Sequence, residues 1–261
     1  MGNFFEMLGA SFFLVMGLMS ILWAVYYVKK NAGIVDIGWA LGFVLSAWAY
    51  LIIGEGYAPK KWLITLMVTA WGIRLAWHLY QRFMLSGEDP RYQEIRKSWG
   101  TQNTDFKFFM MFIFQGVLVV LLSLPFIIIA GDSEPGFQGI ELLGLLVWFG
   151  GLLGETYADQ QLHYFKANPE NHGKVCREGF WHYSRHPNYF FEFIVWIGYY
   201  LFALGTSAGW IAIISPLIIL GLLLKVSGIP LTEAEAIKTK GPDYEEYIRT
   251  TSAFIPWFPK K

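Results

Sequence analysis

Seven long apolar segments are the feature that most limits what this chain can fold into. A helix needs about 20 mostly apolar residues to cross the ~30 Å hydrocarbon core of a bilayer. Open sheet edges cannot be satisfied in lipid, and no stretch shows the alternation of a membrane-spanning strand. The segments that meet the helical requirement are 4–28, 34–53, 62–84, 106–130, 139–160, 189–205 and 209–226. The sequence therefore predicts an all-α fold, a polytopic membrane bundle of about seven transmembrane helices in one domain, 1–261.

The positive charges divide unequally between the two ends of these segments. Of the 20 lysines and arginines, 17 lie in the first, third and fifth loops and the tail. Only Lys60 and Lys61 lie on the other side, and Arg74 lies inside a segment. Cytoplasmic loops of membrane proteins carry the excess of Lys and Arg. We therefore expect the N-terminus outside and the C-terminus in the cytoplasm, with the first segment retained as a helix.

Composition excludes several classes of function. Charged residues make up 15% of the chain and the net charge is zero, so nothing favours a nucleic-acid partner. Five histidines are too few for the repeated boxes of membrane di-iron enzymes. His182 and His186 form one i, i+4 pair without further partners, so we expect no metal site. No G-x-G-x-x-G follows a strand and no P-loop exists, so any nucleotide is held without a Rossmann fold.

The fifth segment carries four polar side chains on one helical face. Glu155, Asp159, His163 and Lys166 follow one another at i, i+4, i+8 and i+11. Charged groups at membrane depth are costly, so such a stripe needs a reason. One interpretation is a solvated stripe where the helix leaves the bilayer. The other is a polar wall that faces a cofactor.

The stretch 179–192, GFWHYSRHPNYFFE, is the most informative in the chain. Pro187 suits the first turn of a helix, and a helix N-terminus favours anions, so Arg185 is placed to meet a phosphate. A buried carboxylate such as Glu192 needs a donor, which a cofactor or a neighbouring helix would supply. The other interpretation is a helix-capping loop with interfacial Arg and aromatic side chains. The candidate cofactor-binding residues here are Arg185, His186, Asn188, Tyr189, Glu192 and Trp196.

The tail offers two interpretations of equal weight. It is expected to form two short helices separated by a turn at 241–242. Arg249, with the threonines that follow it, could close over cofactor phosphates. Alternatively Tyr244, Tyr247 and Trp257 could anchor the tail at the membrane interface.

Asp36 opens the second segment, and Arg74 and His78 lie one turn apart on the third. Asp36 could neutralise Arg74. A structural ion pair and a catalytic pair are both consistent with this pattern.

Several of these stretches together resemble one family. They are IVDIGW in the second segment, WGIRLAWHLYQR in the third, GFWHYSRHPNYFFEFIVWIGYYLFA and the terminal TSAFIPWFPK. In them the chain resembles the bacterial membrane relatives of steroid 5-alpha reductase over nearly its whole length. The resemblance implies a seven-helix bundle that holds NADPH in a cytoplasm-facing cavity and transfers hydride to the beta carbon of an enone.

The resemblance also implies roles for individual residues. Asn188 and Glu192 match residues that hold the nicotinamide and ribose region. Asp159 and Lys166 match an acidic and a basic cofactor ligand on the fifth helix. Glu155 stands where the steroid enzymes carry Asn.

The chain departs from the family at the substrate end. Steroid reductases pair a Gln-Glu dipeptide on the second helix with a Tyr on the third. Here the second helix offers Asp36, and the region of that Tyr reads Ala70-Trp71-Gly72. A desolvated Asp36 could act as general acid, but a nearby Arg74 would favour its charged form. A steroid substrate is therefore not assumed.

Isoprenylcysteine carboxyl methyltransferase and its bacterial relatives share part of the pattern. They also carry Arg-His-Pro-x-Tyr, and they end in a Glu-rich helix, a Tyr-x-x-Tyr-like region and Ile-Pro. The stretch 185–189 with Glu233, Glu235, Tyr244 and Tyr247 fits this loosely, and S-adenosylmethionine would then replace NADPH. The match to the reductases continues past the shared segment, which favours the reductase.

These features predict an NADPH-dependent oxidoreductase that acts on the CH–CH bond of a lipophilic alpha,beta-unsaturated carbonyl substrate. Asp36 and Arg74 are the catalytic candidates. The expected partners are a lipophilic small molecule and membrane lipid, with no obligate protein partner. We expect a multi-pass integral protein of the bacterial inner membrane. A transporter or lipid-binding scaffold would instead place polar residues along a full transmembrane path.

Overall fold

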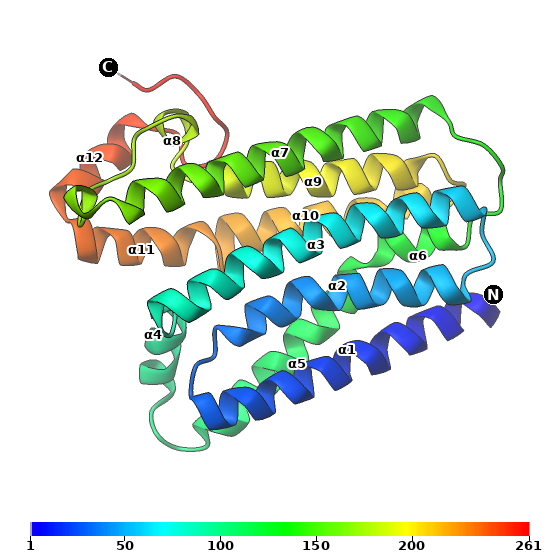
Figure 1. Ribbon diagram of the computed structural model, residues 1–261, viewed down its shortest axis with the longest axis horizontal. Helices are drawn as coiled ribbons and strands as arrows, with labels where there is room; N and C mark the ends of the chain where they lie inside the picture. Colours follow the sequence, from blue (N-terminus) through cyan, green and yellow to red (C-terminus); the bar gives the residue numbers. More distant parts are fainter. Residues whose placement is uncertain (1, 261) are drawn as a thin grey trace. The chain divides into compact units, whose positions relative to one another are not determined.

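The computed structural model describes residues 2–260, without the side chains of residues 85 and 86, and its regular elements are helices (Figure 1). Within that range, strand-like pairing is limited to an isolated bridge between Ser184 and Ser252, which confirms the all-α prediction. The helices are α1 (Gly2–Lys29), α2 (Ile34–Ile53), α3 (Ala58–Ser86), α4 (Pro90–Trp99), α5 (Thr104–Leu122), α6 (Leu124–Ala130), α7 (Gly139–Ala167), η1 (Pro169–Asn171), α8 (Phe180–Tyr183), α9 (Pro187–Leu204), η2 (Gly209–Ile213), α10 (Ile214–Gly221), η3 (Leu222–Val226), α11 (Ile229–Lys240) and α12 (Pro242–Thr250).

Six helical stretches among the described residues are long and apolar enough to cross a membrane. The predicted segment 189–205 corresponds to α9, which has 18 residues and is not one of the six. Six such helices are compatible with an integral multi-pass membrane protein, while the orientation of the termini stays a prediction. The six stretches are Asn3–Lys29, Ile34–Ile53, Ala58–Met84, Thr104–Leu122, Gly139–Ala167 and Gly209–Lys240.

The predicted fourth segment, 106–130, is two helices rather than one. α5 ends at Leu122 and α6 begins at Leu124. Pro125 lies in the first turn of α6, where it has no N–H to donate and disfavours a continuous helix before it. The hydroxyl of Ser123, at the break, donates to the Val120 carbonyl at 2.7 Å. The apolar pattern alone did not reveal this interruption.

The first compact unit comprises Met1–Gln138 and Ala203–Ser215. Within it α2 packs against α1, α3 and α5. Phe43 of α2 is fully buried, with its ring centroid 5.7 Å from that of Trp71 and 6.3 Å from that of Phe126. Aromatic packing of this kind fills the space between α2, α3 and α6.

The second compact unit comprises Gly139–Phe202 and Pro216–Lys261, and it holds most of the predicted cofactor residues. In it α7 and α9 approach one another closely along glycine positions. A Cβ added to Gly151 would lie 2.7 Å from the backbone nitrogen of Val195, and one added to Gly144 would lie 2.5 Å from that of Phe202. Close backbone approach through glycine is typical of helices packed in membranes. The sequence predicted one domain, 1–261, and the division into two compact units does not test that prediction.

Replacing Gly151 with valine is therefore expected to lower the free energy of unfolding by about 1–3 kcal/mol or more, because the neighbouring backbone cannot move aside easily. Gly150→Val is the matched control, since nothing lies within 4 Å of a Cβ built there. Denaturant unfolding of the two variants in detergent micelles measures the difference. Equal stability of the two variants would show that α7 and α9 are not in this contact.

Candidate functional site

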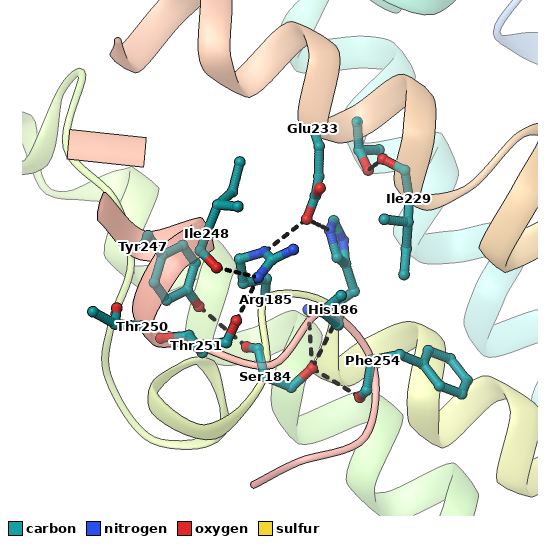
Figure 2. A network of polar contacts seen from close by, with 12 residues as sticks. Ser184, Arg185, His186, Ile229, Glu233, Tyr247, Ile248, Thr250, Thr251 and Phe254 are labelled. Carbon is teal, nitrogen blue, oxygen red and sulfur yellow. Dashed lines mark hydrogen bonds and ion pairs between the residues drawn. The ribbon is translucent and has the colours of Figure 1, made fainter. Parts of the chain in front are cut away.

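A buried ion-pair network centred on Arg185 joins the α8–α9 connection to α11 and α12 (Figure 2). The residue is 8% exposed. Its Nε donates to Oε1 of Glu233 at 2.7 Å, and its Nη1 donates to the Ile248 carbonyl at 3.0 Å and to the Thr251 carbonyl. The guanidinium thus ties the α8–α9 connection to two helices whose contacting residues lie 48 and 63 positions further along the chain. The hydrogen bonds to Glu233 and to the two carbonyls offset part of the cost of burying both charges.

His186 shares the same carboxylate. Its Nε2 lies 3.2 Å from Oε1 of Glu233, and its backbone N–H donates to the Ser184 hydroxyl at 3.1 Å. The imidazole stacks on the ring of Tyr189, with centroids 5.3 Å apart and planes 6° apart. Burial lowers the pKa of His186, and the Glu233 carboxylate opposes this only in part. The ring is therefore neutral near pH 7 and donates Nε2–H to Glu233.

Tyr247 of α12 is hydrogen-bonded to the loop that carries Arg185. Its hydroxyl donates to the carbonyls of Trp181 and Ser184, the latter at 3.1 Å. The indole of Trp181 in turn donates to the Ala158 carbonyl of α7 at 2.9 Å. Burial raises the pKa of Tyr247, so the phenol keeps the proton that these bonds need. Tyr247 is 2% exposed, so it is part of the interior rather than an interfacial anchor.

A second polar pair links α7 to the first turn of α9. The Nδ2 of Asn188 donates to Oδ1 of Asp159 at 3.1 Å. The Oδ1 of Asn188 is buried and accepts no hydrogen bond from the residues that the structure describes. Asp159 and Glu155, one turn apart on α7, are both buried at 7% and 2% exposure. An acceptor left unsatisfied in the interior costs about 1–3 kcal/mol, so a bound donor there would be favourable.

The structure divides the predicted cofactor residues into two groups. The first group is buried or partly buried, and within it Arg185, His186 and Tyr189 belong to the network around Arg185. Asp159 and Asn188 form the polar pair of α7 and α9. His163, Lys166 and Arg249 are instead exposed, the first two near the end of α7 and the third on α12. The buried and partly buried members are Glu155, Asp159, Arg185, His186, Asn188, Tyr189, Glu192 and Trp196.

Glu233 was not foreseen as the partner of Arg185. The only indication in the sequence is the Glu-rich helix that carries Glu233, a feature of the methyltransferase resemblance. Because 48 positions separate the two residues, no local spacing could join them. Because Nε and Nη1 of Arg185 donate to acceptors within the protein, Arg185 links the α8–α9 connection to α11 and α12.

Asp36 in the first unit is contacted by residues that the sequence did not suggest. Its Oδ2 lies 3.0 Å from Nη2 of Arg91 and 3.6 Å from Nη2 of Arg82, and its Oδ1 accepts from the hydroxyl of Tyr92 at 2.5 Å. Burial and then the Asp36 charge raise the pKa of Tyr92 well above its usual value. The phenol is therefore the protonated member of this cluster, and Asp36 is its acceptor.

The sequence offered Arg74 as a candidate partner of Asp36, but it did not offer the residues of α4. Asp89 caps α4 by accepting from the Arg91 N–H at 2.9 Å and also pairs with Arg82 at 2.8 Å. An Asp before Pro at a helix start is a recognisable signal, so the helix itself could have been found. The contact between α4 and Asp36 could not have been found from the sequence in this way.

Over residues 2–260, no group of three or more His, Cys, Asp or Glu side chains is arranged to hold a metal ion.

Comparison with known proteins identifies the family to which this chain belongs. A family model described as "Protein of unknown function (DUF1295)" matches residues 22–251. The chain belongs to this family. DUF1295 is steroid 5-alpha reductase-like in general, so the resemblance stated from the motifs is supported at that level.

One curated relative of this DUF1295 protein is an uncharacterized protein of the fission yeast Schizosaccharomyces pombe. The two are 26% identical over 214 residues, which is 71% of this chain and 61% of the relative. The chain therefore spans about three fifths of the length of the curated relative that it matches. No solved structure matches the chain.

The DUF1295 match contains every candidate site residue, from Asp36 to Arg249. It ends at Thr251, so the last residues of the chain lie outside it.

Proposed function

We propose that this DUF1295 protein is an NADPH-dependent reductase of a lipophilic alpha,beta-unsaturated carbonyl compound. The observation that carries the proposal is the Asp159–Asn188 pair at the start of α9, with a buried, unsatisfied acceptor on Asn188. Membership of a steroid 5-alpha reductase-like family supports the class of reaction.

The residues of the second unit fit the functional groups of a dinucleotide. The free Oδ1 of Asn188 suits a donor such as the carboxamide N–H₂ of nicotinamide. Asp159 holds the Asn188 amide in the orientation that leaves this oxygen available. The buried carboxylates of Glu155 and Asp159 are acceptors for ribose hydroxyls, and exposed Lys166 and Arg249 are cations for phosphates.

When bound, NADPH would supply a hydride to the beta carbon of the substrate. The chain would bind and orient the cofactor through the groups just named and exclude water with the buried ring of Trp196, which is 0% exposed. Asp36 and Arg74 remain the catalytic candidates that the sequence named. A lipophilic substrate that partitions into the membrane agrees with the apolar character of the six long helices.

A methyltransferase that uses S-adenosylmethionine is the second candidate. In its favour, the structure brings together the residues that suggested it. Arg185 pairs with Glu233, and Tyr247 binds the carbonyls of Trp181 and Ser184. We rank it second because this network is satisfied within the chain, whereas Asn188 offers an open acceptor.

Thermal unfolding of the full chain in detergent, with NADPH or S-adenosylmethionine, decides between the two. A ligand at a hundred times its dissociation constant adds about 2.7 kcal/mol to the free energy of unfolding. We expect NADPH to stabilise the protein and S-adenosylmethionine to have no effect. Stabilisation by S-adenosylmethionine alone would overturn the reductase proposal.

A further inference from the structure

The last part of the chain, Thr251–Lys260, lies against the loop that carries Arg185, and we call it the C-terminal strap. Ser252 forms a parallel bridge with Ser184, and its carbonyl accepts from the Arg185 N–H at 2.8 Å. Further along, the Trp257 N–H donates to the Tyr183 carbonyl at 2.9 Å. The backbone of the strap is therefore held along most of its length.

The inner half of the strap, Thr251–Phe254, supports the buried network directly (Figure 2). The Thr251 carbonyl accepts from Nη1 of Arg185, and the Phe254 carbonyl accepts from the Ser184 hydroxyl at 2.9 Å. The Phe254 ring packs against Phe190 of α9, with centroids 5.7 Å apart. Release of the inner half would remove the acceptors of the Ser184 hydroxyl and the Arg185 N–H, and one of the two acceptors of Arg185 Nη1.

The outer half, Ile255–Lys260, has the opposite character. Ile255, Trp257 and Phe258 are 60%, 70% and 74% exposed, although the backbone beneath them is fixed. Phe258 also meets the ring of Tyr183 edge to face, with centroids 5.8 Å apart. Large apolar side chains are stabilised when a surface takes them out of water, so this ordered cluster is suited to a surface that covers it.

The chemistry of the cluster favours a lipid–water interface over a protein partner. Trp is enriched where polar headgroups meet acyl chains, and exposed Lys260 lies two residues after Phe258. A cation beside inserted aromatic rings is complementary to anionic headgroups. Pro256 and Pro259 keep the outer half out of regular helix or strand, so it offers no ladder for a partner strand. The chain that carries it also has six helices apolar enough to cross a membrane.

We propose that the outer half of the C-terminal strap docks on an anionic membrane surface, and that this docking holds the inner half on Arg185 and Ser184. Trp257 and Phe258 enter the headgroup region, and Lys260 lies among anionic headgroups. The membrane thereby stabilises the network around Arg185 from outside the spanning helices. The proposal is independent of the cofactor, so it stands or falls separately from the reductase proposal.

Hydrogen exchange measured by mass spectrometry on the full chain in vesicles tests this. The vesicles contain equal parts of phosphatidylcholine and phosphatidylglycerol. In the double variant Trp257→Ser/Phe258→Ser, we expect the amides of Arg185 and of the strap to exchange at least about tenfold faster than in the unchanged chain. Tyr164→Ser is the control, because Tyr164 is 71% exposed on α7 of the same unit. It should leave these amides unaffected.

The unchanged chain provides a second measurement that needs no substitution. Its strap amides should exchange about fivefold more slowly in the mixed vesicles than in vesicles of phosphatidylcholine alone, because Lys260 then meets anionic headgroups. Equal rates in the two kinds of vesicle would overturn the role of anionic lipid. Equal rates in the double variant and the unchanged chain would overturn membrane docking altogether and leave the aromatic cluster to a protein partner.

Discussion

Arg185→Met is expected to lower the free energy of unfolding by about 3 kcal/mol, the lower end of what breaking a buried ion pair costs. The substitution leaves the Glu233 carboxylate without its guanidinium, and it leaves the carbonyls of Ile248 and Thr251 without a donor. We choose the lower end because the Glu233 side chain is still 17% exposed and water can reach it. Denaturant unfolding in detergent micelles measures the loss.

Arg177→Met is the matched control for this prediction. Arg177 also pairs with carboxylates of α12, at 2.9 Å from Asp243 and 3.3 Å from Glu246, but its side chain is 39% exposed. Exposed pairs contribute about 0–1 kcal/mol, so the control should lose little. If the two variants lost the same stability, the network of Figure 2 would not be a buried tie. A double variant Arg185→Met/Glu233→Met should recover part of the loss, because no buried charge is then left alone.

Asn188→Ala is expected to weaken NADPH binding by about ten- to a hundredfold, because the proposed hydrogen bond to the buried Oδ1 is lost. The change also removes the Nδ2 donor from Oδ1 of Asp159. Titration of NADPH into detergent-solubilised protein, followed by the rise in unfolding temperature, gives the dissociation constant.

Asn171→Ala serves as the control for cofactor binding. Asn171 is in the same unit and its side chain donates to the Phe165 carbonyl at 3.1 Å, so it has a comparable structural role away from α9. NADPH affinity should be unchanged in this variant. Undiminished affinity in Asn188→Ala would instead remove Asn188 from the cofactor site. Glu192→Ala, one turn further along α9, is expected to behave as Asn188→Ala does.

The helices and part of the candidate site could be predicted because both depend on short-range order. Glu155 and Asp159 are four residues apart, so a helix places them on one face without any tertiary information, and both are buried. Pro187 begins α9 because its missing N–H is tolerated only in the first turn. The break between α5 and α6 was also encoded locally by Pro125, but an apolar pattern does not register it.

The partners of the charged residues could not be predicted in the same way. Asp36 contacts Arg91 and Tyr92, which are 55 and 56 positions away, on a helix that the apolar pattern assigned to a polar loop. Tyr244 and Tyr247 were equally consistent with a membrane anchor, and the structure buries both. Residue spacing predicts which side chains share one face of a single helix, whereas these contacts depend on how different helices pack against one another.

The sequence by itself determined that this chain is an all-helical membrane protein of a steroid 5-alpha reductase-like family, because apolar length and local motifs are properties of single segments. Only the tertiary structure decided which of its polar residues satisfy one another. In the structure, Arg185 donates to Glu233 and to two backbone carbonyls, whereas Oδ1 of Asn188 is left unsatisfied. The physical reason is that a buried charge must find its partner wherever packing brings one, and that place is set by the fold rather than by distance along the chain.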